Sequence, residues 1–259
     1  MSAGTALVTG ASAGIGLEFC RQLAGRGYDL VLVARDAERL AAVAAELGAR
    51  HGVAAEVLAA DLARDADVDR VVARLAGTAG ITLLVNNAGF GTTGAFAESP
   101  PELQERMVRL HVLAPVRLTR AVLPGFIARG RGGVINVSSV ASFIYAPGSA
   151  NYCATKAHLT TFTEGLGTEL AGTGVVVQAL CPGFTRSEFH QRMGPGAGNR
   201  PAFMWMTAAA VVRASLAQLD RRGAVVCVPG LGYKFLVALA RVVPRRMIGR
   251  LTGRAYRRM

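Results

Sequence analysis

The chain has 259 residues, of which 51% are hydrophobic and 18% are charged, so it can form one large α/β domain with a sizeable core. Its four cysteines are scattered, without a Cys-x-x-Cys pair or a histidine cluster. This argues against a metal site or a disulfide framework and favours the reducing cytoplasm. The first apolar strand begins within a few residues of Met1 and no apolar run reaches about 18 residues, so we expect neither a signal peptide nor a membrane span.

The net charge is distributed unevenly. Of the formal +12, eight charges lie beyond residue 230, where no acidic residue occurs, and the part before it carries only about +4. These eight residues are Lys234, Arg241, Arg245, Arg246, Arg250, Arg254, Arg257 and Arg258. We therefore expect one domain over residues 1–230 and a basic, amphipathic helical extension over residues 231–259.

A short apolar strand at Thr5–Thr9 runs into a glycine-rich turn at residues 10–16, and a helical pattern follows at once. Such a turn lets backbone N–H groups and the helix N-terminus face a pyrophosphate. The residues expected to make these contacts are Gly10, Ser12, Gly14, Ile15 and Gly16.

The second strand, Asp29–Ala34, ends at Arg35, about twenty residues further on, where dinucleotide-binding folds read the adenosine ribose. An acidic residue there would accept from the free 2′-hydroxyl of NAD, whereas a guanidinium suits the 2′-phosphate of NADP, with Ser12 assisting. Arg35 therefore predicts NADP(H). The alternative is that Arg35 lies in solvent at the strand end while Asp36 caps the next helix.

Two further strands end in polar residues. The strand over residues 54–60 ends at Asp61, which either accepts from an adenine amino group, with Leu62 beside it, or caps the helix over residues 64–76. The strand over residues 81–85 leads into a polar turn whose asparagines either fix neighbouring strands or reach the cofactor ribose. The cofactor contacts expected in this turn are Asn87, Ala88 and Gly89.

A long helix is expected over residues 101–129, with prolines at its start. By this point strands and helices have alternated along the chain. We therefore predict an α/β fold, a Rossmann-like, doubly wound parallel sheet in a single domain with helices on both faces.

The apolar run at residues 133–139 predicts a buried strand that ends at Ser139, on the sheet edge where ligands bind. Tyr152 opens the next helix, and Lys156 lies one turn on, about 6 Å away on the same face. A lysine cation beside a phenol favours the phenolate, so Tyr152 could exchange a proton with a substrate oxygen. The alternative is a Tyr-x-x-x-Lys spacing on an ordinary solvated helix face.

A further strand at residues 174–180 is followed by an irregular stretch, residues 183–206, that interleaves glycine and proline with large apolar side chains. Such a stretch predicts a lid or binding loop for an apolar substrate, or else apolar side chains that simply pack on the core. Thr207 is expected to cap a helix over residues 208–219, and residues 225–228 close the sheet.

These motifs occur in order: Thr9-Gly10-x-x-x-Gly14-x-Gly16, the Asn86–Gly89 turn, Ser139, Tyr152-x-x-x-Lys156 and Pro182-Gly183. Over roughly residues 4–230 the chain resembles the short-chain dehydrogenase/reductase family. The resemblance implies hydride transfer between the nicotinamide and a carbonyl or secondary alcohol. It makes Tyr152 the acid/base, Ser139 the residue that orients the substrate oxygen, and Lys156 the residue that holds the ribose and depresses the tyrosine pKa. It places Pro182, Gly183, Thr185 and, as a further candidate, Ser187 along the nicotinamide end of the cofactor.

One position departs from the family pattern. Members similar to this chain usually carry an asparagine in the long fourth helix, where it supports a water that relays protons to the lysine. His111 occupies that place here, so His111 is a candidate member of the catalytic group whose role in the relay is open. The competing interpretation is that His111 fills the helix packing seam and bonds to a backbone carbonyl.

Two interpretations of function follow. The first is an NADP(H)-dependent reductase of an apolar ketone or aldehyde, which would also oxidise the alcohol, working as a homodimer or homotetramer. The second is a cofactor-binding protein with little turnover. Beyond Pro244 an apolar helical face adjoins an arginine face, which predicts either peripheral contact with an anionic membrane or docking on a neighbouring subunit. Nucleic-acid binding is not expected, because the basic tail lacks interleaved aromatic residues. The two faces comprise Met247, Ile248, Leu251 and Ala255, and Arg246, Arg250, Arg254 and Arg257.

Overall fold

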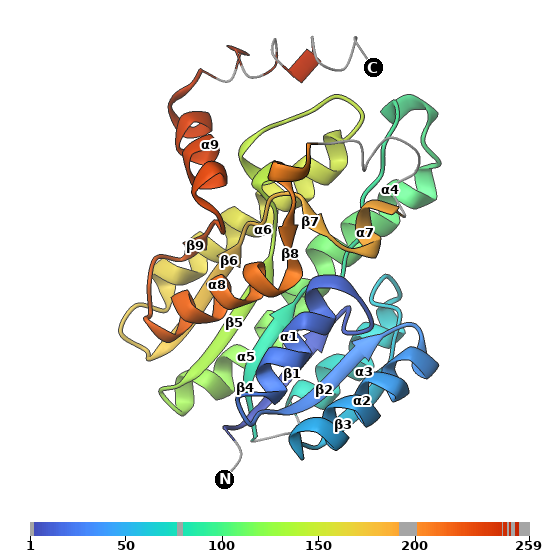
Figure 1. Cartoon of the computed structure of the whole chain (residues 1–259), viewed down its shortest axis with the longest axis vertical. Helices are drawn as coiled ribbons and strands as arrows, with labels where there is room; N and C mark the ends of the chain where they lie inside the picture. The colour runs from blue at the N-terminus through green and yellow to red at the C-terminus, as the bar shows by residue number, and fades with distance from the viewer. Residues whose placement is uncertain are drawn as a thin grey trace.

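A computed structural model describes residues 3–76, 80–191 and 201–244, together with residues 246, 247, 249, 252 and 253. Its centre is a seven-stranded parallel sheet with the order β3-β2-β1-β4-β5-β6-β9 (Figure 1). The strands are β1 Thr5–Thr9, β2 Asp29–Ala34, β3 Ala55–Ala59, β4 Ile81–Asn86, β5 Gly132–Val137, β6 Val175–Leu180 and β9 Val226–Cys227. The fold class expected from the sequence is confirmed.

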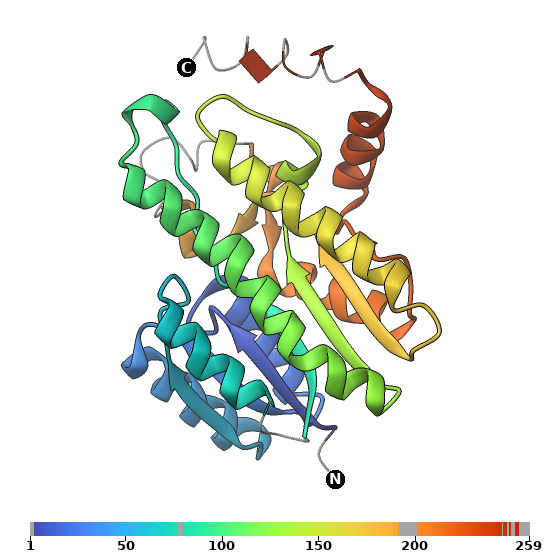
Figure 2. The same cartoon turned by 180° about the vertical axis from the view of Figure 1, so that it is seen from behind.

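Helices cover both faces of the sheet. One face carries α1 Gly14–Ala24, α2 Ala37–His51 and α8 Ala208–Asp220, and the other carries α3 Asp65–Ala76, α5 Ala114–Ala128 and α6 Ala150–Glu169. Figure 2 shows the second layer from its outer side, with the green and yellow helices crossing the sheet. Because strands between two helix layers are buried on both faces, they appear in the sequence as continuous apolar runs.

The strand order reverses at the centre of the sheet. β1 pairs with β2 on one side and with β4 on the other, so the segments that leave the carboxyl ends of β1 and β4 lie beside each other. Ligands of open α/β sheets bind at this reversal. The glycine-rich turn after β1 and the asparagine turn after β4 both lie there.

The long helix expected over residues 101–129 is interrupted. It begins as α4, Pro101–Val108, passes through a π-helical turn, η2, at Arg109–Leu113, and continues as α5. Single π-turns inside α-helices occur frequently at functional sites. His111 lies in the middle of this turn.

The same helical run corrects the expectation that no apolar segment is long enough to span a membrane. Among the described residues, Pro101–Ala128 is long and apolar enough, by length and composition alone, to cross a membrane. In the structure its Leu118, Val122 and Phe126 are buried against the sheet in the second hydrophobic cluster. It is therefore a core helix of the α/β layer.

Two helix caps agree with the sequence. The Asp36 carboxylate accepts the backbone N–H of Arg39 at 3.0 Å, and the Thr207 hydroxyl accepts that of Ala210 at 3.2 Å. Each satisfies one of the N–H groups that the first turn of a helix leaves unpaired. The predicted starts of α2 and α8 are confirmed.

The irregular stretch after β6 contains short elements where it is described: β7 Thr185–Arg186, α7 Glu188–Gln191, η4 Ala202–Met204 and β8 Met206–Thr207. β7 and β8 pair with each other in a small parallel sheet. Met193, one of the apolar residues assigned to this stretch, falls outside the described residues.

The extension beyond residue 230 begins with a helix, α9, at Leu231–Val242. Val237 is buried in a third hydrophobic cluster beside Ala179, Cys181 and Val228, and Tyr233 packs against it. The start of the extension is thus attached to the domain. The predicted faces beyond Pro244 fall mainly outside the described residues, namely at Ile248, Arg250, Leu251, Arg254, Ala255 and Arg257.

Candidate active site

The turn between β1 and α1 has the backbone shape of a phosphate cradle. Gly10 and Gly14 have φ angles of 67° and 57°, in the left-handed region where a Cβ is unfavourable. A Cβ on Gly16 would lie 2.2 Å from the Gly10 carbonyl oxygen, so only glycine allows this approach of turn and helix. The expected residues Gly10, Gly14 and Gly16 therefore expose the N-terminus of α1, while Ser12 and Ile15 are half-buried beside them.

The two asparagines after β4 have different roles. Asn86 is buried, and its amide donates to Asn136 Oδ1 at 2.8 Å and to Thr119 Oγ1 at 3.2 Å, so it joins β4 to β5 and α5. The Asn87 amide donates to the Thr9 carbonyl at 2.8 Å and the Gly10 carbonyl at 3.3 Å. Of the two roles left open by the sequence, fixing neighbouring segments is the one these contacts show.

Thr9 completes this connection. Its hydroxyl accepts the backbone N–H groups of Asn87 and Ala88, at 2.9 and 3.0 Å. The glycine-rich turn and the asparagine turn are thus tied together by side-chain bonds. Gly89 follows at the surface, next to the ring of His111.

Arg35 is exposed at the end of β2, and no ion pair or hydrogen bond joins its side chain to another part of the described chain. Asp36 caps α2 at the same time, so the alternative assignment of Asp36 is compatible with a phosphate-binding Arg35. One turn further, Arg39 makes two bonds to Glu188 of α7, at 2.6 and 3.1 Å. This ion pair joins α2 to the stretch after β6.

Asp61 was expected either to contact adenine or to cap the helix over residues 64–76. Its carboxylate accepts the Ala63 N–H at 3.1 Å and pairs with Arg106 at 2.6 Å, while α3 begins only at Asp65. It therefore ties the loop after β3 to α4 and is not the N-cap of α3. Leu62 is buried in the second hydrophobic cluster. Contact of either residue with adenine stays a prediction.

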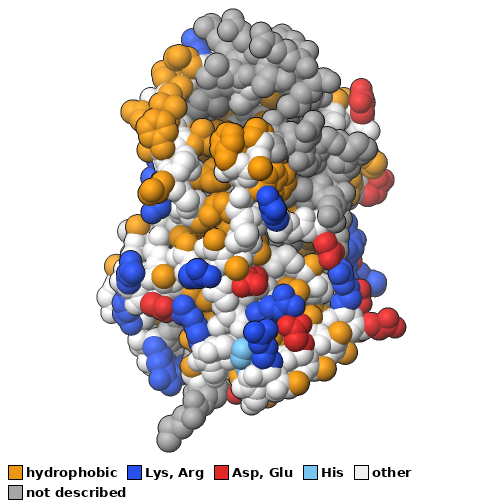
Figure 3. All heavy atoms as spheres, in the orientation of Figure 1, with side chains coloured by type: hydrophobic (Ala, Val, Ile, Leu, Met, Phe, Trp, Pro, Cys, Tyr) orange, Lys and Arg blue, Asp and Glu red, His pale blue; other side chains and the backbone are white. Residues whose placement is uncertain are grey.

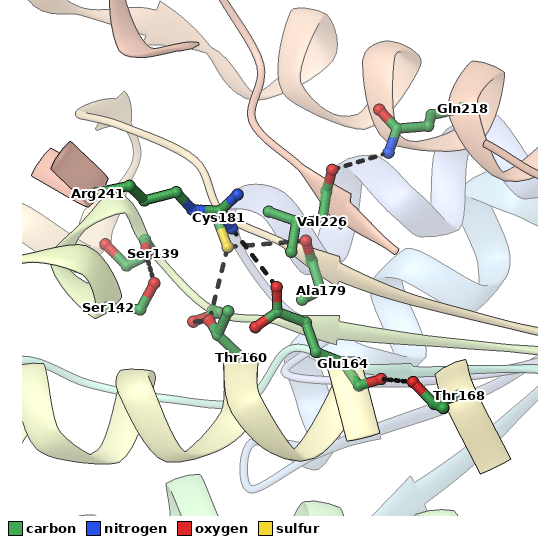
Figure 4. A network of polar contacts seen from close by, with 11 residues as sticks. Ser139, Ser142, Thr160, Glu164, Thr168, Ala179, Cys181, Gln218, Val226 and Arg241 are labelled. Atoms are coloured by element: carbon green, nitrogen blue, oxygen red, sulfur yellow. Dashed lines mark hydrogen bonds and ion pairs between the residues drawn. The ribbon is translucent and has the colours of Figure 1, made fainter. Parts of the chain in front are cut away.

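Ser139 lies directly after β5, at the start of the short helix η3, Val140–Phe143. Its hydroxyl accepts the Ala141 N–H at 3.1 Å and lies near enough to the Tyr152 phenol to lower the pKa of that group. Its carbonyl accepts from Ser142 at 2.7 Å, as Figure 4 shows. These bonds fix Ser139 at the start of η3.

Lys156 is buried one turn after Tyr152 on α6. Its ammonium donates to the Val137 carbonyl at 2.8 Å and lies 5.8 Å from the centre of the Tyr152 ring. Ser138 fixes the helix backbone here, because its hydroxyl donates to the Lys156 carbonyl at 2.8 Å. An ammonium has three donors, so the Lys156 ammonium can still bond to a ligand. The sequence grouping of Ser139, Tyr152 and Lys156 is thus brought together in space.

The expected effect of Lys156 on the tyrosine pKa is wrong for this structure. Burial raises the pKa of Tyr152 to about 12, although the hydrogen bond from Ser139 opposes this, and burial lowers the pKa of Lys156 to about 8. The sequence argument considered charge proximity, whereas desolvation dominates in this dry site. Tyr152 therefore holds its proton at neutral pH.

His111 is fully enclosed between the asparagine turn and α6. Its Nε2 accepts the Phe90 N–H at 3.0 Å, so the neutral ring carries its proton on Nδ1 and donates it to Thr155 Oγ1 at 3.1 Å. Burial, and then the charge of Lys156, hold the pKa of His111 well below 6.5. The expected bond to a backbone carbonyl is replaced by a bond from a backbone N–H. A role in proton relay stays a prediction.

Aromatic side chains lie beside the ring of Tyr152. The centre of the His111 ring lies 5.9 Å and that of Phe189 6.0 Å from the centre of the Tyr152 ring, and the centre of the Phe90 ring lies 5.7 Å from that of His111. Of the apolar residues in the stretch after β6, Phe189 therefore faces the site. Phe184 and Trp205 pack together at 5.6 Å, whereas Phe203 is exposed.

The segment after β6 lies against the glycine-rich turn. A Cβ on Gly14 would be 3.0 Å from Ser187 Cβ, and the Thr185 hydroxyl donates to the Gly183 carbonyl at 3.0 Å. The Pro182 carbonyl accepts the Val140 N–H at 3.0 Å, next to Ser139. The segment from Pro182 to Ser187 thus runs from the start of η3 beside Ser139 to the glycine-rich turn, and its contact with the nicotinamide end of a cofactor stays a prediction.

Sequence reasoning missed Tyr233. Its hydroxyl accepts the Phe184 N–H at 3.0 Å and donates to the Met204 carbonyl at 2.6 Å, which fastens both described ends of the stretch after β6. A Cβ on Gly183 would lie 2.0 Å from the Tyr233 ring, so glycine is required there. Only the glycine itself could have indicated this close approach, because Tyr233 lies beyond the family motifs.

Comparison with known proteins identifies the family. The model of the short chain dehydrogenase family matches residues 4–197. A short-chain dehydrogenase from Sphingobium yanoikuyae, solved in complex with NADPH, is 41% identical, with a TM-score of 0.84 over 92% of this chain and 93% of that one. The bulky-bulky ketone specific alcohol dehydrogenase from Comamonas testosteroni is 35% identical, with a TM-score of 0.81 over 93% of each chain.

A curated relative is similar over most of this chain. The very-long-chain 3-oxoacyl-CoA reductase of Anas platyrhynchos is 32% identical over 82% of this chain. The chain spans 67% of that relative and 53% of its namesake from Phaeosphaeria nodorum, about half the length of the latter. With the serine, tyrosine and lysine assembled beside a glycine-rich turn, these matches show that the chain belongs to the short-chain dehydrogenase family of oxidoreductases.

Proposed function

We propose that the protein is an NADP(H)-dependent reductase of apolar ketones or aldehydes that can also oxidise the corresponding secondary alcohols. The observation that carries this proposal is the protonated Tyr152, whose pKa the nearby Ser139 lowers in part and whose ring is bordered by Phe189 and His111. An acid placed among aromatic rings suits a carbonyl that bears apolar substituents.

The residues divide the work of carbonyl reduction. When bound, the nicotinamide supplies the hydride. Ser139 donates a hydrogen bond to the substrate oxygen and orients it, and Tyr152 gives that oxygen its proton as negative charge develops there. Lys156, with its pKa lowered to about 8, keeps a cation beside the resulting phenolate and can return a proton near neutral pH. The free donors of Lys156 would hold the nicotinamide ribose.

Preference for NADP(H) over NAD(H) rests on Arg35. Its guanidinium is exposed at the carboxyl end of β2 without a partner in the described chain, so binding a phosphate breaks no existing ion pair. Two charge-assisted hydrogen bonds, each of about 1.5 to 3 kcal/mol before solvent screening, would produce a tenfold or greater preference. The NADPH complex of the Sphingobium yanoikuyae relative supports the same choice.

The names of the relatives and the aromatic residues near Tyr152 both support bulky apolar ketones as substrates. The relatives include a bulky-bulky ketone specific alcohol dehydrogenase and a very-long-chain 3-oxoacyl-CoA reductase, both of whose names describe large substrates. We propose ketones with an apolar group on each side of the carbonyl. Their groups would lie against Phe90 and Phe189.

The test is NADPH oxidation against a panel of ketones that differ in the size and polarity of the two substituents. We expect kcat/KM for bulky apolar ketones to exceed that for small polar ones by about tenfold or more. In parallel, Arg35→Ala should weaken NADPH binding at least about tenfold and leave NADH binding unchanged, because only NADPH carries the 2′-phosphate. Arg50→Ala, which removes an exposed arginine from the far end of α2, is the matched control.

The second candidate is a cofactor-binding protein with little turnover, and His111 in place of the asparagine favours it. Absence of turnover with every ketone, together with tight NADPH binding, would support this candidate. Turnover in the wild type would remove it.

Assembly and location complete the proposal. Three large apolar side chains are exposed on α4, η2 and α5, namely Val108, Leu113 and Ile127, and this supports a homodimer or homotetramer.

The four cysteines are free and buried, which supports a reducing compartment such as the cytoplasm. Light scattering on the purified protein tests the first point, and fractionation of cells that express it tests the second.

A further inference from the structure

Within the described residues, helix α9 contacts the domain with one of its sides. Val237 is buried beside Cys181 and Val228, and the Tyr233 hydroxyl bonds to Phe184 and Met204. At the far end of the helix, Arg241 lies over the ring of Phe143, 5.0 Å from its centre. Arg241 also reaches Glu164 of α6 at 3.5 Å, as Figure 4 shows. These contacts determine which side of α9 faces outward.

The outward side is apolar. Leu231 is 83% exposed, Phe235 72%, Leu239 48% and Val242 79%. Their spacing of four, four and three residues places them in one stripe along the helix, the outer stripe. Figure 3 shows hydrophobic side chains gathered over α9, whereas charged side chains of both signs are interspersed over the lower part of the same face.

A helix that is apolar on two sides normally has a partner on each. On α9 the inner side has the domain, whereas no described residue of this chain covers the outer stripe. Four large exposed side chains in a row exceed the scattered apolar residues of an ordinary surface. The outer stripe therefore marks a docking surface.

The charge beside the outer stripe indicates the partner. From residue 231 onward the chain carries eight basic residues and no acidic one, and Lys234 stands on α9 itself. A second copy docked on this stripe would bring two such positively charged segments together, and like charges repel. The headgroups of anionic lipids would instead neutralise them, while the acyl boundary would receive the apolar side chains.

We propose that α9 lies on the surface of an anionic lipid bilayer, with the outer stripe inserted at the acyl boundary and the exposed Lys234 beside it among the headgroups. This surface differs from the predicted membrane face beyond Pro244, and the proposal does not depend on the reaction that the protein catalyses. Since Tyr233 fastens Phe184 and Met204 from the inner side of the same helix, docking would hold the stretch beside Tyr152 close to the membrane.

The experiment compares sedimentation of the full chain with two kinds of vesicle at low salt. One is equimolar phosphatidylcholine and phosphatidylglycerol, and the other is phosphatidylcholine alone. The test variant is Phe235→Ser/Leu239→Ser, which removes half of the outer stripe. The matched control is Val57→Ser, which removes an exposed apolar side chain from β3, far from α9 in the sequence and outside the surfaces discussed above. All three positions are exposed, so neither variant should unfold the domain, and circular dichroism checks this.

We expect the wild type and the control to bind anionic vesicles at least about tenfold more tightly than neutral ones, with binding that weakens as salt rises. The Phe235→Ser/Leu239→Ser variant should bind anionic vesicles at least about tenfold more weakly than the wild type. Failure of the wild type to bind anionic vesicles would overturn the proposal, as would undiminished binding by the variant. Self-association without lipid that this variant abolishes would instead assign the outer stripe to a second copy of the chain.

Discussion

The Nε2 atom of His111 accepts the backbone N–H of Phe90 at 3.0 Å, which joins the π-helical turn to the segment after the asparagine turn. On its other side the imidazole donates to Thr155, whose hydroxyl in turn donates to the Tyr152 carbonyl at 2.9 Å. A Cβ on Gly89 would lie 2.9 Å from Nε2, so glycine is required where the histidine approaches. His111 therefore connects the loop after β4 with the helix that carries the acid.

His111→Asn should reduce the acid sensitivity of the fold. Because the folded pKa lies well below that of the unfolded chain, about 6.5, the unfolded state alone gains this proton as the pH falls, and stability decreases. From about pH 7 to about pH 5 the histidine should account for a loss of about 2 kcal/mol in the free energy of unfolding. Urea unfolding of both proteins at these two pH values measures the difference. Equal losses in the two proteins would show that the ring charges readily in the folded state.

The same variant tests the proton relay. If His111 supports the relay, pH–rate profiles of the wild type and His111→Asn will differ in their low-pH limb. If it only positions Phe90 and Thr155, the two profiles will superimpose after scaling. An inactive wild type that the asparagine rescues would favour the cofactor-binding protein.

Tyr152→Phe should lower kcat by about 10²- to 10⁴-fold, because the lost hydroxyl supplies the proton to the substrate oxygen. NADPH affinity should change by less than about threefold, since a single neutral hydrogen bond to the ribose contributes little. Steady-state kinetics and fluorescence titration measure the two effects. The control is Tyr28→Phe, because Tyr28 directly precedes β2 and so lies at the amino-terminal ends of the strands, away from Tyr152. Wild-type turnover in Tyr152→Phe would remove the tyrosine from the mechanism.

Lys156→Met should change the alkaline stability profile. The folded ammonium loses its proton near pH 8, whereas the unfolded one keeps it to about pH 10.5, so this group makes stability rise with pH within that window. The four buried thiols, whose pKa values burial raises, act in the opposite direction in both proteins. Subtracting the two unfolding profiles should therefore isolate a rise of about 3 kcal/mol that the methionine variant lacks. A flat difference would mean that Lys156 is better solvated than its burial indicates.

Glu188→Gln should speed the release of NADPH. Its ion pair with Arg39 joins α7 to α2, and both side chains are partly exposed. The preceding residue, Ser187, lies against Gly14 of the glycine-rich turn. An exposed pair contributes little, so we expect release to be about two- to fivefold faster in stopped-flow measurements. Asp220→Asn breaks the comparable Arg26–Asp220 pair at the amino edge of the sheet and is the control. An equal effect of both substitutions would show that Glu188 does not retain the cofactor.

Local patterns predicted most of the architecture. The apolar runs of β1, β4 and β5 and the capping residues Asp36 and Thr207 act over a few residues, so their placement could be read directly from the sequence. The π-helical turn could not be predicted, because one additional residue in a turn barely alters the apolar periodicity of a long helix.

Long-range relationships could not be predicted either. Arg39 and Glu188 are 149 residues apart, and no sequence motif around either residue predicts their ion pair. The pKa of Tyr152 was predicted in the wrong direction because burial depends on packing by Phe189 and His111, which the Tyr-x-x-x-Lys spacing does not contain. Grouping Ser139 with Tyr152 and Lys156 succeeded because all three positions belong to a known motif.

The contact between Phe184 and Trp205 has a practical use. Trp205 is the single tryptophan of the chain, so intrinsic fluorescence excited at the red edge of protein absorption originates from this one position. Its neighbour Phe184 is held by Tyr233, and Trp205 itself directly follows Met204, whose carbonyl Tyr233 also holds. The unmodified protein thus contains an optical probe of the segment beside the catalytic tyrosine. Emission from that probe can follow ligand entry in real time without any attached dye.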